Sequence, residues 1–153
     1  MPISQATGTE IIRSILYDNI DNSPTGICVV GERYHIYTIL SITVYCTTVD
    51  STVANNRWTG SITGWSGRLG STNSEITIFK TPILEVGETY VWNDKFSFNG
   101  TEPTGISGDH DIVAEQTAIA AQGSTTSQSL GVVGGSSACK ADITCTFIDQ
   151  NNT

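Results

Sequence analysis

The residues of this chain that could do chemistry are two histidines, four cysteines and 15 acidic side chains. Nucleophilic catalysis needs a Ser, Cys or Thr oriented by a base, and only His35 and His110 offer an imidazole. Asp109, His110 and Asp111, with Glu115 four residues later, carry ligand atoms that suit a divalent cation. A solvated acidic loop is the simpler interpretation of that cluster, and His35 is expected to point outward from the start of a strand. We therefore expect no catalytic residue, no metal and no cofactor.

The cysteines lack the spacing of a zinc site. Cys28, Cys46, Cys139 and Cys145 contain no Cys-x-x-Cys pair. If the last two share a strand, they lie about 20 Å apart at ~3.3 Å per residue, too far to bond to each other. We expect all four cysteines to be thiols that are not oxidised. The alternative is a disulfide that joins Cys139 or Cys145 to Cys28 or Cys46.

Three further acidic residues and the glycines of the chain are explained by predicted turns and loops, without a catalytic role. Glu85, Glu88 and Asp94 lie in predicted turns, so a glycosidase pair of carboxylates is not expected. No Gly-x-Gly-x-x-Gly, Walker loop or Gly-x-Ser-x-Gly elbow occurs. The sequence therefore predicts a protein that is not an enzyme.

The composition narrows the possible partners. A chain of 153 residues fits one domain, and its 14% of charged residues is well below the ~25% of an average soluble domain. The net charge of -8 leaves no basic stripe for nucleic acid. No run approaches the ~18 apolar residues of a membrane span, and the first residues do not resemble a leader, so we expect synthesis in a cytoplasm without membrane binding.

The elements that would position these side chains are strands. Residues 34–48 alternate for a dozen positions, which indicates a long central strand. Its predicted inner face is made of Ile36, Leu40, Ile42, Val44 and Cys46, and its outer face mostly of His35, Tyr37, Ser41, Thr43, Tyr45 and Thr47.

Other segments are typical of shorter strands. They are residues 10–17, for which a helix is the alternative, and residues 57–65, 75–80, 89–92, 95–98 and 141–150. Residues 85–100 predict a β-hairpin, with turns at 85–88, 93–94 and 99–100. Residues 111–122 suit either a short helix or an edge strand, and residues 123–137 are expected to be exposed, mobile or held by a neighbouring chain.

The predicted fold is all-β: a single β-sandwich or jelly roll of about seven or eight mainly antiparallel strands. Residues 1–9 form an N-terminal arm and residues 10–153 the domain. Uncharged sheet edges invite partner strands, which favours self-assembly. The candidate partner contacts are Trp58 and Trp65, for which core packing is an equal alternative, and Ile3 and Gln5 in the arm.

Three segments together resemble a known group. They are Ile39-Leu40-Ser41-Ile42-Thr43-Val44, the block Val86-Gly87-Glu88-Thr89-Tyr90-Val91-Trp92-Asn93-Asp94-Lys95-Phe96-Ser97-Phe98, and the ending Ile143-Thr144-Cys145-Thr146-Phe147-Ile148-Asp149-Gln150. Over about half of its length, the chain resembles small β-sandwich virion structural proteins of tailed bacteriophages, especially phages of marine cyanobacteria. It departs from their shorter pattern between residues 101 and 138.

The resemblance implies a structural virion component, assembled in the host cytoplasm, that binds as a homo-oligomer such as a trimer. Its other partners would be the major capsid protein or neck and tail proteins. A capsid decoration or cement role is preferred. The alternatives are a neck or tail adaptor, a fibre-associated component, or a module that recognises glycans on the host surface.

Overall fold

The computed structural model describes residues 9–23, 27–65, 74–101 and 127–151. These residues form nine strands and one short 3-10 helix, η1 (Val53–Asn55). The strands are β1 (Thr9–Ile20), β2 (Ile27–Val30), β3 (His35–Thr48), β4 (Trp58–Trp65), β5 (Ser74–Lys80), β6 (Thr89–Trp92), β7 (Phe96–Asn99), β8 (Ser129–Gly134) and β9 (Lys140–Asn151). Within these ranges, no helix is long and apolar enough to cross a membrane.

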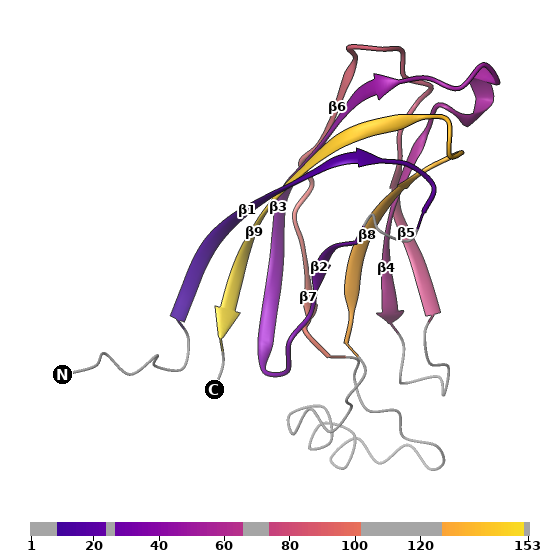
Figure 1. Cartoon of the computed structure of the whole chain (residues 1–153). Coiled ribbons are helices and arrows are strands. Elements are labelled where there is room, and N and C mark those ends of the chain that lie inside the picture. Colours follow the sequence, from indigo (N-terminus) through magenta and orange to yellow (C-terminus); the bar gives the residue numbers. More distant parts are fainter. Residues whose placement is uncertain (1–8, 24–26, 66–73, 102–126, 152–153) are drawn as a thin grey trace.

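Two antiparallel sheets form the fold (Figure 1). The first, here called the β3 sheet, has the order β1-β9-β3-β6, with β7 also paired to β3. The second, here called the β4 sheet, has the order β2-β8-β4-β5. When β6 and β7 are taken as one interrupted strand, this is the order of an eight-stranded jelly roll, and the predicted fold class is confirmed.

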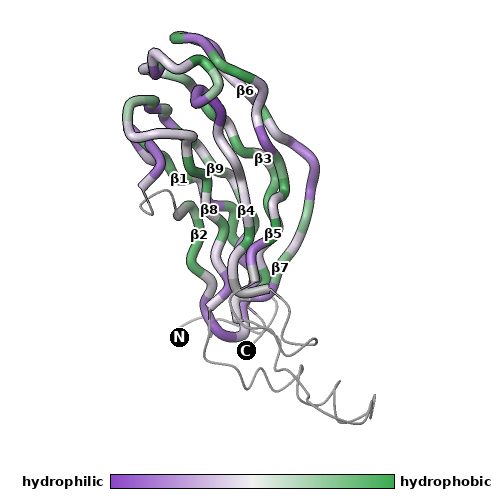
Figure 2. The backbone as a smooth tube through the Cα atoms, turned by 90° about the vertical axis from the view of Figure 1, so that its right-hand side faces the viewer, coloured by the Kyte–Doolittle hydropathy of each residue, from purple (hydrophilic) through white to green (hydrophobic). Residues whose placement is uncertain are grey.

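The core lies between the facing sides of the two sheets. Hydrophobic stretches recur along the strands of both layers (Figure 2). The largest fully buried side chains include Ile39, Ile42 and Ile143 of the β3 sheet and Trp58 and Leu130 of the β4 sheet. Each such side chain contributes about 1.5–3 kcal/mol by leaving water, so burial between the sheets holds the two layers together.

The predicted hairpin of residues 85–100 is wrong in its central turn. β6 pairs with residues 42–45 of β3, and β7 pairs with residues 36–39 of the same strand. The two short strands therefore follow one another along β3, and residues 93–95 form a bulge between them. A type I′ turn needs positive φ at both central residues, and neither Asn93 nor Asp94 has it. The first predicted turn is confirmed, because Glu88 N–H donates to the Glu85 carbonyl at 3.0 Å and Gly87 has φ +86°.

A bulge also changes the inward face of β3. In the pairing with β9, Ile39 faces Phe147 and Ser41 faces Thr146, so Leu40 is an extra residue. One added residue moves every earlier side chain of the strand to the other face of the sheet. Between the start of β3 and Leu40, the inward and outward positions are therefore the reverse of those predicted. The predicted inward face is confirmed for Ile42, Val44 and Cys46, which are fully buried.

Before Leu40, the prediction for β3 is wrong. Tyr37 and Ile39 point into the core, whereas Ile36 and Leu40 lie on the opposite face. His35 shares the inner face, and its side chain is only 19% exposed.

One strand lies where the sequence predicts an exposed or mobile segment. β8, within residues 123–137, is a central strand of the β4 sheet, and its Leu130 and Val132 are fully buried. Two alternating aliphatic residues are enough to bury a six-residue strand, although the glycines around them lower its mean hydropathy. The strand predicted at residues 10–17 is confirmed as part of β1. Residues 1–8 of the predicted arm and residues 111–122 lie outside the described residues.

The sheets come together closely at the end of β7. Gly100 N–H donates to the His35 carbonyl at 2.8 Å, and Gln128 N–H donates to the Gly100 carbonyl at 3.0 Å. A Cβ on Gly31 would lie 2.1 Å from the Gly100 oxygen. Backbone contact of this kind requires glycine at both positions.

Candidate functional site

A charged cluster joins three strands at the lower end of the β3 sheet. Asp149 of β9 accepts contacts from Arg13 Nε of β1 at 3.2 Å and from His35 Nδ1 of β3 at 2.6 Å. The other imidazole nitrogen lies 3.6 Å from a carboxylate oxygen of Glu32. Since the Asp149 side chain is only 11% exposed, its contacts with Arg13 and His35 give this nearly buried carboxylate the partners that it needs.

This cluster has the geometry of a structural tie. It lines a cavity of about 340 Å³ together with Cys28 and Tyr37. Burial raises the pKa of the Cys28 thiol to about 12, and burial likewise raises the pKa of the Tyr37 phenol to about 12. Both groups therefore stay protonated at neutral pH and are poor nucleophiles.

The buried thiols do not form bonds with one another. No disulfide joins the four cysteines, as expected, and all four are buried. Burial raises the pKa of the Cys145 thiol to about 12, and it also raises the pKa of Cys46. Within the part of the chain that the structure describes, no group of three or more His, Cys, Asp or Glu side chains could hold a metal ion.

A second carboxylate, that of Asp50, also acts structurally. Asp50 accepts hydrogen bonds from the Ser136 hydroxyl, from Thr52 N–H at 2.8 Å and from Asn55 Nδ2 at 3.0 Å. The Ser136 bond is the largest of the causes that lower the pKa of Asp50 to about 2. These bonds tie the loop around η1 to the loop that precedes β9.

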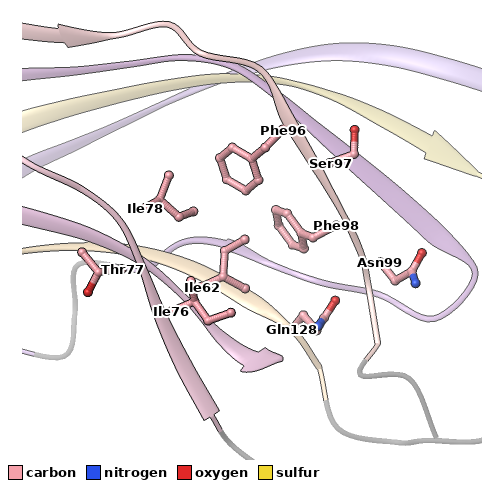
Figure 3. Close-up of a pocket in the computed structure, with 9 residues that line it drawn as sticks. All are labelled: Ile62, Ile76, Thr77, Ile78, Phe96, Ser97, Phe98, Asn99 and Gln128. Atoms are coloured by element: carbon pink, nitrogen blue, oxygen red, sulfur yellow. The ribbon is translucent and has the colours of Figure 1, made fainter. Parts of the chain in front are cut away.

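An apolar groove opens between the sheets on the side of β5 and β7 (Figure 3). It has a volume of about 490 Å³ and none of its lining residues is charged. Phe96 and Phe98 of β7 project toward isoleucines of the opposite sheet in this view. The lining residues are Ile62, Ile76, Thr77, Ile78, Phe96, Ser97, Phe98, Asn99 and Gln128.

A bulge in β5 lies at this groove. Gly60 of β4 faces Phe79, and Ser61 faces Thr77, so Ile78 is the extra residue of β5. Phe79 lies over Gly60, where a Cβ would approach its ring to 2.2 Å, and it stacks on Tyr90 across the sandwich. The groove has apolar walls without an acid or a base, so it offers binding surface and no proton-transfer chemistry.

The outer side of β1 is a surface of a different kind. β1 ends the strand order of the β3 sheet and pairs on one side only, with β9. Ile12 is 69% exposed and Leu16 is 60% exposed, on the face that also carries Ser14. Among the described strands none pairs with the other edge of β1, so these exposed aliphatics stand beside an edge that can accept a further strand.

The three other sheet edges within the described ranges are protected. β2 is four residues long, and the edge made by β6 and β7 is interrupted by the bulge at residues 93–95. β5 carries Glu75, Lys80 and the bulge at Ile78. Short length, charges and bulges are the usual protections of an edge; β1 is 12 residues long and regular up to Tyr17, and between Glu10 and Asp18 its single charged side chain is that of Arg13, which is paired with Asp149.

Of the two tryptophans predicted as candidate partner contacts, Trp58 lies in the core, and the side chain of Trp65 is not described. Trp58 is fully buried, and its Nε1–H donates to the Ile20 carbonyl at 3.4 Å, so the packing alternative holds for it. The side chain of Trp65, as well as Ile3 and Gln5, lie outside the described residues. The same is true of the acidic cluster at residues 109–115.

The surface formed by Ile12 and Leu16 on β1 was not predicted from the sequence. Ile12 and Leu16 belong to a predicted strand, but alternation within one strand cannot show whether that strand ends a sheet. The signal that was present is the absence of Lys, Pro and Gly between residues 9 and 20, since Lys and Pro are common protections of an edge strand.

Comparison with known proteins yields one fold likeness. No protein-family model and no curated protein sequence matches this chain. A solved structure described as "Bacillus endospore appendages form a novel family of disulfide-linked pili" aligns over 100% of this chain and 97% of the other, with a TM-score of 0.43 and 12% identity. This likeness is too low to transfer any property of that protein to this chain.

Proposed function

We propose that this chain is a structural subunit that assembles with copies of itself on a larger particle. The observation that carries the proposal is the long edge of β1, which is regular up to Tyr17 and has Ile12 and Leu16 exposed beside it. A long, regular edge with few charges is a liability in a protein that stays alone, and it is useful in a subunit that pairs.

The surface around this edge supports docking. Across β1, β9 and β3, the outer face between the strand ends carries hydroxyl and aliphatic side chains. Its central members are Ile12, Ser14, Leu16, Thr38, Leu40, Ser41, Thr43, Thr144, Thr146 and Ile148. A surface free of charges can be covered without desolvating ions, which removes a large cost of association.

The finer proposal is a component of a tailed-phage virion, with capsid decoration or cement preferred over a neck, tail or fibre-associated place. It is supported by the sequence resemblance described above. Its partners would be other copies and the major capsid protein or neck and tail proteins, and its location would be the virion.

The proposed role is not enzymatic. His35, the described imidazole, is engaged by Asp149 at 2.6 Å and lies 3.6 Å from Glu32, so both of its ring nitrogens face carboxylates. The role of a glycan-stacking module has no support from the described tryptophan side chains. Trp58 is in the core, and Trp92 is half-buried between Phe79 and Phe96.

Sedimentation velocity from about 1 to 500 µM tests self-assembly of the full chain. We expect the weight-average mass to rise with concentration. A constant monomer mass over the whole range would contradict the proposal. Quantitative mass spectrometry of purified particles tests the finer proposal: hundreds of copies indicate capsid decoration, a dozen or fewer indicate the neck or tail, and none contradicts a virion role.

A further inference from the structure

We propose that β1 pairs antiparallel with β1 of a second copy, about a two-fold axis at Ser14, so that the two β3 sheets become one continuous sheet. This inference rests on the proposed self-assembly and names its contact. A symmetric contact of this kind uses the same surface on both copies. It makes the two-fold pair the basic unit, in place of the trimer considered from the sequence.

The side chains of two β1 strands are complementary when Ser14 of one copy lies opposite Ser14 of the other. Residues that face one another across an antiparallel pair share a face of the sheet. With Ser14 opposite Ser14, Ile12 of each copy lies opposite Leu16 of the other. The two most exposed aliphatic side chains of the strand therefore form two cross-strand pairs, one on each side of the axis. Cross-strand side-chain pairs are a main source of sheet stability.

The neighbouring registers are worse. A shift that places Arg13 opposite Arg13 sets two like charges face to face, which is destabilising. A shift in the other direction places Ile12 opposite Asp18 and leaves Leu16 opposite Ser14. Registers displaced further shorten the overlap or reach Asn19, which has φ +55° and interrupts the strand.

Charge is kept away from the centre of this contact. Arg13 lies on the opposite face of the strand from Ile12 and Ser14 and is paired with Asp149 at 3.2 Å, so between Glu10 and Asp18 the outer face of β1 has no charge. In the proposed register, Glu10 of each copy lies opposite Asp18 of the other, at both ends. Together with a net charge of -8 per copy, this repulsion predicts that added salt strengthens the pair.

The size of the contact sets its strength. The nine paired residues from Glu10 to Asp18 extend about 30 Å, and a sheet about 10 Å thick then buries on the order of 600 Å² in total. This is below the ~1,200–2,000 Å² of a standard interface, so the isolated pair is expected to be weak, with a Kd of micromolar or above. On a particle, additional contacts would raise the effective concentration of neighbouring copies.

Cysteine cross-linking tests the register. Ser14→Cys is expected to give a covalent dimer under mild oxidation at concentrations where the wild type associates. Ile12→Cys and Leu16→Cys are expected to cross-link when mixed and to give little product alone. The four native cysteines are buried and give a low background.

Thr146→Cys is the matched control. The Thr146 hydroxyl lies 3.0 Å from that of Ser14 on the same face, but it belongs to β9, one strand inside the sheet. Two copies of residue 146 would be about 14 Å apart at ~4.8 Å per strand, too far for a disulfide. Equal cross-linking of Thr146→Cys and Ser14→Cys would overturn the proposed geometry.

A charge at the edge gives an independent test. Ile12→Lys is expected to raise the dissociation constant at least tenfold, whereas Val86→Lys, with the same charge change at an equally exposed turn position, is expected to leave it unchanged. Thermal melts of each variant check that the fold is retained.

The outcomes separate the two proposals. If the wild type associates and Ser14→Cys does not cross-link, or Ile12→Lys associates normally, the β1 contact is wrong and self-assembly stands. If the wild type stays monomeric at 500 µM, both proposals are wrong.

Discussion

Replacing Gly100 by Ala tests how the two sheets are closed at the end of β7. A Cβ on residue 100 would lie 1.7 Å from the carbonyl oxygen of Glu32, whereas ordinary contact begins at 3.4 Å. The two backbone segments would therefore have to separate by about 1.7 Å. Neither can move alone, because Gly100 is bonded to His35 on one side and to Gln128 on the other.

The magnitude follows from the hydrogen bonds that such a movement breaks. Gly100 N–H to the His35 carbonyl and Gln128 N–H to the Gly100 carbonyl are 2.8 and 3.0 Å long, and Gly100 is buried. A buried backbone group left without a partner costs about 1–3 kcal/mol. We expect Gly100→Ala to lower the free energy of unfolding by about 3 kcal/mol, a large fraction of the ~5–15 kcal/mol of a typical domain.

Equilibrium urea unfolding followed by far-UV circular dichroism measures this loss. Gly87→Ala is the matched control, because a Cβ there meets nothing within 4 Å and only the φ of +86° opposes the substitution. That backbone conformation costs about 1–2 kcal/mol for a residue other than glycine. If Gly100→Ala loses no more stability than Gly87→Ala, the close backbone contact does not constrain this end of the sandwich.

Three further predictions use the same unfolding measurement. Asp149→Asn removes the carboxylate that contacts both Arg13 and His35 and should cost about 1–3 kcal/mol; an unchanged midpoint would contradict a structural tie. Ile42→Ala, in the sealed core, should cost about 3 kcal/mol, whereas Ile78→Ala, at the open groove, should cost about 1 kcal/mol, and equal losses would mean that the groove side is packed like the core. Burial raises the pKa of Cys28 and Cys145 to about 12, so the folded state holds these protons more tightly than the unfolded state, where thiols titrate near 9. Stability should be full below pH 9 and fall as the pH rises toward 12, and Ellman's reagent should not label the native protein at pH 8.

Much of the strand content follows from local pattern. The alternation of Ile42, Val44 and Cys46 requires a strand with one buried face, because a helix would scatter these side chains around its axis. The turn at residues 85–88 could also be predicted, since glycine accepts the positive φ that this turn needs. Such features depend on a few neighbouring residues.

The wrong predictions, for the first half of β3 and for the hairpin, concern features that depend on contacts between residues distant in the sequence. The bulge at Leu40 appears only when β3 is laid against β9, so the inverted face of Tyr37 and Ile39 cannot be read from β3 alone. Likewise, residues 89–99 have the composition of a hairpin, but the longer β3 is available as a partner for both halves. The competition between partners decides pairing, and it takes place in three dimensions.

The amino-acid order by itself determined that this protein is an all-β domain with few charges and alternating aliphatic strands. Only the tertiary structure decided which strands are central and which are edges, and with them the candidate surface. The physical reason is that side-chain alternation reports burial of one face, a property of each strand, whereas an edge is defined by the absence of a neighbouring strand. Ile12 and Leu16 are ordinary strand residues in the sequence, and they form the candidate surface because β1 lies last in its sheet.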